Sequence, residues 1–210
     1  MNETVFTIGH STHPIDVFIG LLKMHGVTAL GDVRSRPHSR MNPQFNREPL
    51  KDALQAANIK YVFLGKELGA RSEDKNCYRD GQVQYDLLAQ TTLFKEGIKR
   101  VEQGAKDFRI ALMCAEKEPL ECHRTILVAR RLFENGFAVK HILYDGRVED
   151  HASTIERLIC LRRVPSTDMF REHDAVISDA YALQAKDIAY RDENTERDMT
   201  PHQVASRTAE

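Results

Sequence analysis

Short apolar runs alternate with amphipathic stretches along most of this chain, and that alternation is the strongest constraint on its fold. Apolar runs typical of buried strands occupy residues 5–8, 27–33, 61–64, 109–114 and 139–144. Stretches with apolar side chains at helical spacing occupy residues 14–25, 48–57, 84–104, 122–135 and 149–161. Strands that alternate with helices form parallel sheets covered on both faces. The sequence therefore predicts an α/β fold, a Rossmann-like three-layer sandwich with a mostly parallel five-stranded sheet.

The chain changes character after Pro165. We assign residues 1–165 to the α/β domain and residues 166–191 to a helical C-terminal extension, because apolar residues recur there at helical spacing. Residues 192–210 are polar and without periodicity, which is typical of a flexible tail.

The overall charge is almost balanced, with 30 basic against 31 acidic side chains and a formal net charge of −1. That balance excludes a polycation that grips nucleic acid through bulk charge, but it permits a local basic patch. An apolar fraction of 41% also excludes a disordered chain.

The first residues carry no basic segment, and no run of about 18 apolar residues occurs. We therefore expect a cytoplasmic protein with no membrane partner and with reduced thiols. Of its four cysteines, we expect Cys77 to be exposed in a loop and Cys160 to lie in the protein core, on the apolar face of a helix. Nothing in the sequence indicates an oligomeric state.

Unusual polar residues follow four of the predicted strands, in segments 9–12, 32–40, 64–71 and 114–124. Ligands of open parallel sheets bind beyond the carboxyl ends of the strands, so these segments are expected to converge on one site.

The segment after the second strand is a basic patch. Arg34, Arg36, Arg40 and Arg47 occur there without an acidic residue between Val33 and Arg47. Arginine forks match phosphate oxygens in pairs. A solvated loop is the plainer interpretation, but we favour an anion site that binds a phosphate-bearing small molecule or nucleic acid. Its predicted residues are His10, Ser11, Arg34, Arg36, Arg40, Arg71 and Arg124.

The segment after the fourth strand carries the candidate catalytic residues. Cys114 ends the strand, and Cys122 lies at a helix start beside His123 and Arg124. The helix dipole and adjacent cations favour a thiolate there. Glu116 is a candidate proton carrier.

Three interpretations of these residues compete. We favour nucleophilic or redox chemistry in which Cys114 or Cys122 attacks and His123 or Glu116 moves protons. A metal site would combine both cysteines with His10 or His123, but adjacent residues rarely reach one ion and no CxxC knuckle occurs, so we assign no metal ligand. Ordinary buried cysteines are the third interpretation. A phosphatase loop would need an arginine where Leu120 stands.

These motifs, in this order, resemble a bacterial and archaeal family known as domain of unknown function 488. The matching segments are Thr7–Ser11, Asp32–Arg34 with Arg36-Pro37, Leu64-Gly65 with Leu68-Gly69, and Cys114-x-Glu116-x-x-Pro119-x-x-Cys122-His123-Arg124. The resemblance covers about residues 4–145 and departs at Ala70, where many members have glycine. It implies an α/β fold and a shared site at His10, Arg34, Arg36, Cys114, Glu116, Cys122, His123 and Arg124, but it supplies no reaction.

The sequence thus predicts an enzyme with a cysteine-containing site that acts on a phosphate-bearing substrate, such as a nucleotide or a nucleobase in nucleic acid. The alternatives are a non-catalytic nucleotide- or nucleic-acid-binding module and a metal-binding Cys/His protein. No cofactor is indicated.

Overall fold

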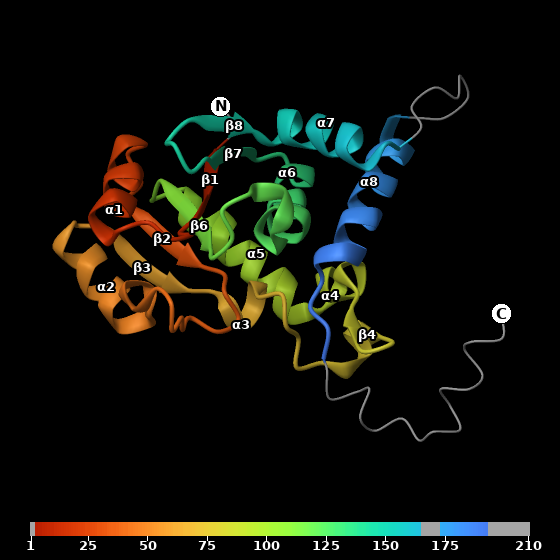
Figure 1. The fold of residues 1–210 in the computed structure, drawn as a ribbon, viewed down its shortest axis with the longest axis horizontal. Helices are drawn as coiled ribbons and strands as arrows, with labels where there is room; N and C mark the ends of the chain where they lie inside the picture. Colours follow the sequence, from red (N-terminus) through yellow and green to blue (C-terminus); the bar gives the residue numbers. More distant parts are fainter. Residues whose placement is uncertain (1–2, 165–172, 193–210) are drawn as a thin grey trace.

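The computed structural model describes residues 3–164 and 173–192, and its centre is a six-stranded sheet (Figure 1). The strand order is β3 (Lys60–Phe63), β2 (Ala29–Asp32), β6 (Ile110–Cys114), β1 (Thr4–Gly9), β7 (Ala138–Ile142) and β8 (Val148–Asp150). The first five strands are parallel, and β8 runs antiparallel to β7. The predicted α/β class and mostly parallel sheet are confirmed.

The prediction of five strands was wrong, because it missed β8. This strand has only three residues, two of them acidic, and gives no apolar run. It forms because Gly146, with a φ of 86°, turns the chain back directly after β7. The Leu143 amide then donates to the Arg147 carbonyl at 2.8 Å and closes the hairpin.

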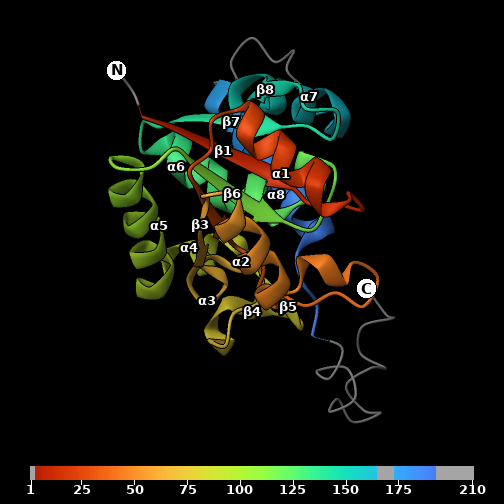
Figure 2. The same cartoon turned by 90° about the vertical axis from the view of Figure 1, so that its left-hand side faces the viewer.

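Helices cover both faces of the sheet. Helices α1 (Ile15–Met24) and α2 (Arg47–Ala56) lie on one side, toward the viewer in Figure 2. The other side carries α4 (Tyr85–Gln90), α5 (Thr92–Ala105), the π-helix η4 (Arg124–Ala129) with its continuation α6 (Arg130–Glu134), and α7 (His151–Arg162). Each side has its own core, because successive strand residues point to opposite faces. In β6, Leu112 packs in the core beneath α5, whereas Met113 packs in the core beneath α1 and α2.

The predicted helix over residues 84–104 is interrupted at Thr91, whose side chain caps α5 by accepting a hydrogen bond from the Phe94 amide at 3.2 Å. Residues 65–83, between the third predicted strand and the predicted helix over 84–104, contain the short helix α3 (Gly65–Leu68), the turn η2 (Lys75–Cys77) and a hairpin of β4 (Tyr78–Arg79) and β5 (Gln82–Val83).

The structure reverses both expectations about the outlying cysteines. Cys77 is buried, because the hairpin folds it onto the core beneath α4. Cys160 is exposed, because it lies one position beyond the buried stripe of α7, which ends at Ile159.

Helix α8 (His173–Ile188) lies within the segment assigned to the C-terminal extension. It packs into the main core through Val176, Ala180 and Tyr181. The proposed domain boundary at residue 165 and nearly all of the predicted tail lie outside the described residues. Within the described residues, no helix is both long enough and apolar enough to span a bilayer.

Candidate functional site

A cavity of about 650 Å³ opens at the carboxyl ends of β1, β2 and β6. We call it the site cavity. Tyr85 from the start of α4, and Ile188 and Tyr190 from the end of α8, complete its wall. The predicted site residues that line it are His10, Ser11, Arg34, Arg36, Arg71, Cys114, Glu116, Cys122 and His123. Four segments far apart in sequence therefore converge as predicted, and only Arg40 and Arg124 of the predicted set are absent from the lining.

A second hollow of about 790 Å³ shares Tyr85 with the site cavity and is lined by Arg130, Lys186 and Arg191 among others. Of the described residues, no cysteine or histidine lines it. The reactive side chains thus belong to the smaller cavity.

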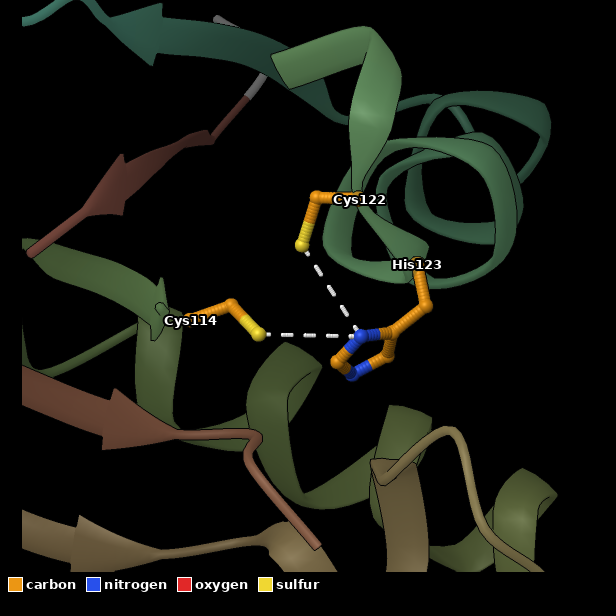
Figure 3. A group of neighbouring side chains, drawn as sticks. All are labelled: Cys114, Cys122 and His123. Carbon is orange, nitrogen blue, oxygen red and sulfur yellow. Dashed lines mark hydrogen bonds between the residues drawn. The ribbon is translucent and has the colours of Figure 1, made fainter. Parts of the chain in front are cut away.

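Cys114, Cys122 and His123 form a buried group that we call the Cys–His cluster (Figure 3). Nδ1 of His123 lies 3.6 Å from Sγ of Cys114 and 3.8 Å from Sγ of Cys122. Cys114 is the last residue of β6, whereas the other two lead into the π-helix η4. The turn η3 (Pro119–Glu121) brings the chain back between them, so the cluster is fixed by regular structure on both sides.

The orientation of the His123 ring is set by backbone. Its Nε2 lies 3.1 Å from the carbonyl oxygen of Val33, at the end of β2. A carbonyl oxygen only accepts hydrogen bonds, so Nε2 carries the proton and Nδ1 faces the two sulfurs.

The pKa values of the two thiols are shifted in opposite directions. Burial alone would raise the pKa of Cys122, but the hydrogen bond from Cys114 and the positive charges of Arg124 and His123 outweigh it and hold that pKa well below its usual range. Burial, followed by the interaction with Cys122, holds the pKa of Cys114 well above its usual range. Of the two thiols, Cys122 is therefore the one whose surroundings favour the thiolate.

The neighbours of the thiolate respond to its charge. Burial alone would lower the pKa of His123, but the hydrogen bond to Cys122 and its negative charge raise it. Oε2 of Glu116 lies 3.0 Å from Sγ of Cys122. Desolvation of this carboxyl group, followed by the negative charge on Cys122, raises the pKa of Glu116.

Arg124 supports the loop of the cluster from behind and does not line the cavity. The side chain is fully buried, and its guanidinium donates to the carbonyl oxygens of Glu116 at 2.7 Å and Lys117 at 3.3 Å. Gly9 permits this arrangement, because a Cβ atom there would lie 1.9 Å from the Glu116 carbonyl oxygen. The structure thus gives Arg124 a positioning role, while its predicted anion contact stays a prediction.

Arg34 is also held by protein groups. Its guanidinium forms a two-point ion pair with Asp32, with Nε to Oδ1 at 2.9 Å and Nη2 to Oδ2 at 2.6 Å. It also donates to the Phe45 carbonyl at 2.9 Å and lies 3.2 Å from Nε2 of His10. Burial lowers the pKa of His10 to about 4, so its ring is neutral, with Nδ1 donating to the Ser11 carbonyl at 2.9 Å. These contacts shape the wall of the cavity.

The cations that remain available lie at the mouth of the cavity. Arg36 and Arg71 are exposed there, and the Arg71 guanidinium stacks over Tyr190 at 4.2 Å. Lys117, which sequence reasoning passed over, lines the same mouth with its ammonium 4.1 Å from the Tyr144 ring centre. Tyr85 and Tyr190 were also missed, because each lies far in sequence from the motifs it faces.

The chain matches the family model described as "Domain of unknown function DUF488" over residues 14–131, more than half of its length. The curated proteins contain no match to it, and neither do the solved structures. The matched residues include the basic segment, the Cys–His cluster and Arg124, and the resemblance noted from the sequence is therefore confirmed. The chain belongs to the DUF488 family.

Proposed function

We propose that this chain is an enzyme that acts on a phosphate-bearing substrate in the site cavity, with a nucleotide or a nucleobase in nucleic acid as the first class to test. The observation that carries the proposal is the division of one cavity into two parts. Buried sulfur and imidazole groups lie in its interior, the exposed Glu116 lies beside Cys122, and exposed cations lie at its mouth. A phosphate at the mouth would place the rest of the substrate over the reactive groups.

Arg36, Arg71 and Lys117 are the groups we assign to the phosphate. None of them forms an ion pair with another residue that the structure describes, and their exposed side chains can reorient around an anion. Arg34 is a poorer candidate, because Asp32 already takes two of its donors. We assign catalysis to Cys114, Cys122, His123 and Glu116.

A non-catalytic nucleotide- or nucleic-acid-binding module is the second candidate. It is favoured by the burial of Cys114 and Cys122, which are 3% and 1% exposed. Such a module would use the cations at the mouth and would turn over no substrate. Oligonucleotides would then bind with a steep dependence on salt, because bound phosphates release counterions.

Two further expectations, about the type of sheet and the location of the protein, accompany this proposal. We infer that the sheet is of the Rossmann-like three-layer type, since a mostly parallel sheet with a core on each face places ligands at the carboxyl edge. We also keep a cytoplasmic location as an expectation, which agrees with the free state of all four cysteines.

Binding of inorganic phosphate, mononucleotides and short oligonucleotides, measured by calorimetry, tests the proposal. Losing a charged hydrogen bond costs about 1.5–3 kcal/mol, so Arg36→Ala and Arg71→Ala should each weaken binding about tenfold or more. Arg40→Ala is the matched control, because Arg40 is exposed in the same segment but does not line the cavity.

Turnover separates the two candidates. Cys114→Ser and Cys122→Ser should keep ligand affinity and lose turnover if the chain is an enzyme. Binding without turnover in the wild type supports the binding module. The absence of binding by every phosphate-bearing ligand, or equal losses in Arg36→Ala and Arg40→Ala, contradicts both.

A further inference from the structure

We propose that the Cys–His cluster is a metal centre that holds one thiophilic divalent cation, zinc in the first place, through Sγ of Cys114, Sγ of Cys122 and Nδ1 of His123. A fourth coordination position would face the site cavity. The metal site stands on the geometry of these residues alone; only the use of its open position by a substrate rests on the proposed function.

The spacing of the three donor atoms matches a tetrahedral zinc site. With zinc–sulfur bonds of about 2.3 Å and zinc–nitrogen bonds of about 2.0–2.1 Å, tetrahedral angles put sulfur and nitrogen about 3.5–3.6 Å apart. The two sulfur–nitrogen distances here are 3.6 and 3.8 Å, and all three donor atoms lie within 4.8 Å of one another. An ion could therefore bind with little movement of the protein.

Adjacent residues reach the same ion because the backbone bends between them. Cys122 is extended, with φ −136° and ψ 139°, whereas His123 is helical, with φ −58° and ψ −26°. This change at the start of η4 directs both side chains toward Cys114 (Figure 3). Neighbouring residues rarely bind the same ion when both have the same backbone conformation. Cys122 and His123 differ in backbone conformation, so this objection to a shared ion does not apply to them.

The surroundings of the donors are those of a metal site. Ligating histidines almost always donate their second ring nitrogen to a backbone carbonyl or a carboxylate, which fixes the ring. Nε2 of His123 makes this contact with the Val33 carbonyl at 3.1 Å. The Arg124 amide lies 3.4 Å from Sγ of Cys122 and donates to it, which stabilises a ligating thiolate. Side chains that only filled the core would need neither of these two contacts.

The chemistry of the donors selects the class of ion. Thiolate and imidazole ligands suit zinc and related thiophilic ions, whereas magnesium and calcium require oxygen ligands. Two thiolates and a neutral imidazole also cancel the charge of a divalent cation, which suits a cluster whose members are all buried.

Three protein ligands define a site of the catalytic type. Closed structural zinc sites use four protein ligands, whereas catalytic sites use three and leave the fourth position to water or substrate. The three donor residues all line the site cavity, together with Glu116. The fourth position would therefore open where the proposed substrate lies, rather than into the core.

Metal content tests the proposal without any substrate. The full chain, purified after growth with zinc, should contain about one thiophilic ion per chain by elemental analysis, and the chelated chain should take up one equivalent again. Cobalt in its place should give sulfur-to-cobalt charge-transfer absorption, which reports thiolate ligation in the wild-type chain. This measurement needs no variant and so does not depend on how variants fold.

Variants then identify the ligands. Losing a group that only supports a ligand weakens metal binding by about 10–100-fold, so losing a ligand itself in Cys114→Ser, Cys122→Ser or His123→Asn should weaken zinc binding by more than about 100-fold. Cys160→Ser is the matched control, because that thiol is exposed and does not line the site cavity, and it should leave zinc affinity unchanged.

A chelated wild-type chain that fails to regain an ion overturns the metal centre, and so does cobalt without charge-transfer absorption or zinc binding that survives Cys114→Ser and Cys122→Ser. Phosphate-ligand binding in the same metal-free chain would leave the proposed function standing. Conversely, full metal occupancy without any phosphate-ligand binding would overturn the proposed function and leave the metal centre in place.

Discussion

Asp32 and Arg34 form a buried ion pair at the carboxyl end of β2, with Nη2 and Oδ2 at 2.6 Å and the two side chains 0% and 6% exposed. The Asp32 carboxylate also accepts from the Arg34 amide at 3.1 Å and from the Tyr61 hydroxyl at 3.0 Å. The pair therefore fixes the first turn of the basic segment, two residues before Arg36 enters the mouth of the cavity.

Replacing Arg34 with leucine should destabilise the fold strongly. Removing one partner of a buried pair leaves an uncompensated charge and costs about 3–5 kcal/mol. The free energy of unfolding from urea titration measures this loss. The exposed Arg36 is the matched control, and Arg36→Leu should change stability by less than about 0.5 kcal/mol. Similar losses in both variants would show that the Asp32–Arg34 pair does not hold the segment.

Gly9→Ala should disturb both stability and ligand binding. The new Cβ would lie 1.9 Å from the Glu116 carbonyl oxygen, so the loop below the Cys–His cluster must move. Overpacking of this kind costs about 1–3 kcal/mol or more. Gly20→Ala in α1 is the control, since a Cβ there meets nothing within 4 Å, and it should stabilise the exposed helix by up to about 1 kcal/mol. Thermal unfolding with equal midpoints for the two variants would contradict this account.

Two buried histidines that do not line the site cavity should make stability depend on pH. Hydrogen bonds run from Thr7 to His141 at 2.7 Å, from His141 to His151 at 2.9 Å, and from His151 to Tyr181 at 2.9 Å. Burial lowers the pKa of His151 to about 4. Burial, followed by repulsion from His151 whenever that ring is protonated, lowers the pKa of His141 well below its usual range. Folding therefore keeps both rings neutral.

Stability should fall as the pH drops from about 6.5 to about 4, because the unfolded histidines bind protons in this window and the folded ones do not. Each contributes at most about 1.4 kcal/mol per pH unit. Urea titrations at several pH values in this window give the slope of the unfolding free energy against pH. The His151→Gln variant should lose the part of this slope that one histidine contributes.

The comparison of slopes is made between variants, because Glu116 and His123 have raised pKa values and act in the opposite sense. His38→Gln, which changes an exposed ring, should keep the wild-type slope. A wild-type slope in His151→Gln would mean that folding does not exclude the proton from that ring.

Gln184 should anchor α8 beside the site cavity. This buried side chain donates from Nε2 to the Leu120 carbonyl at 2.8 Å and accepts from Nε of Arg162. Gln184→Met keeps the volume but leaves the carbonyl unpaired, which costs about 1–3 kcal/mol. The neighbouring Leu183 is 46% exposed, so Leu183→Ala should stay within about 0.5 kcal/mol in the same unfolding measurement. A Gln184→Met variant as stable as Leu183→Ala would rule out the anchor.

The sequence predicted the parallel part of the fold well, because buried parallel strands are continuous apolar runs. The runs at residues 5–8 and 109–114 correspond to β1 and β6, which pair at the centre of the sheet. The short β8 and the β4–β5 hairpin were missed, since their pairing depends on turns and on distant packing rather than on local composition. The prediction that Cys160 is buried failed for a related reason, because Ile159 is buried and the next residue of the helix is exposed.

The site was predicted where residue type and strand position agreed. Cys114, Cys122 and His123 gather as the motif suggested, and whether they act as a metal centre or as a nucleophile stays a prediction. The roles within the basic segment depended on burial, which the sequence pattern did not resolve. Arg34 is buried and paired with Asp32 two residues before it, whereas Arg36 lies exposed at the mouth.

The wall that Ile188 and Tyr190 contribute to the site cavity reaches it from the far end of the described chain, opposite His10 and Ser11. Every strand of the structure precedes α8 in the sequence. A variant shortened before α8 would therefore retain the residues of the whole sheet while losing Ile188 and Tyr190 from the wall of the cavity.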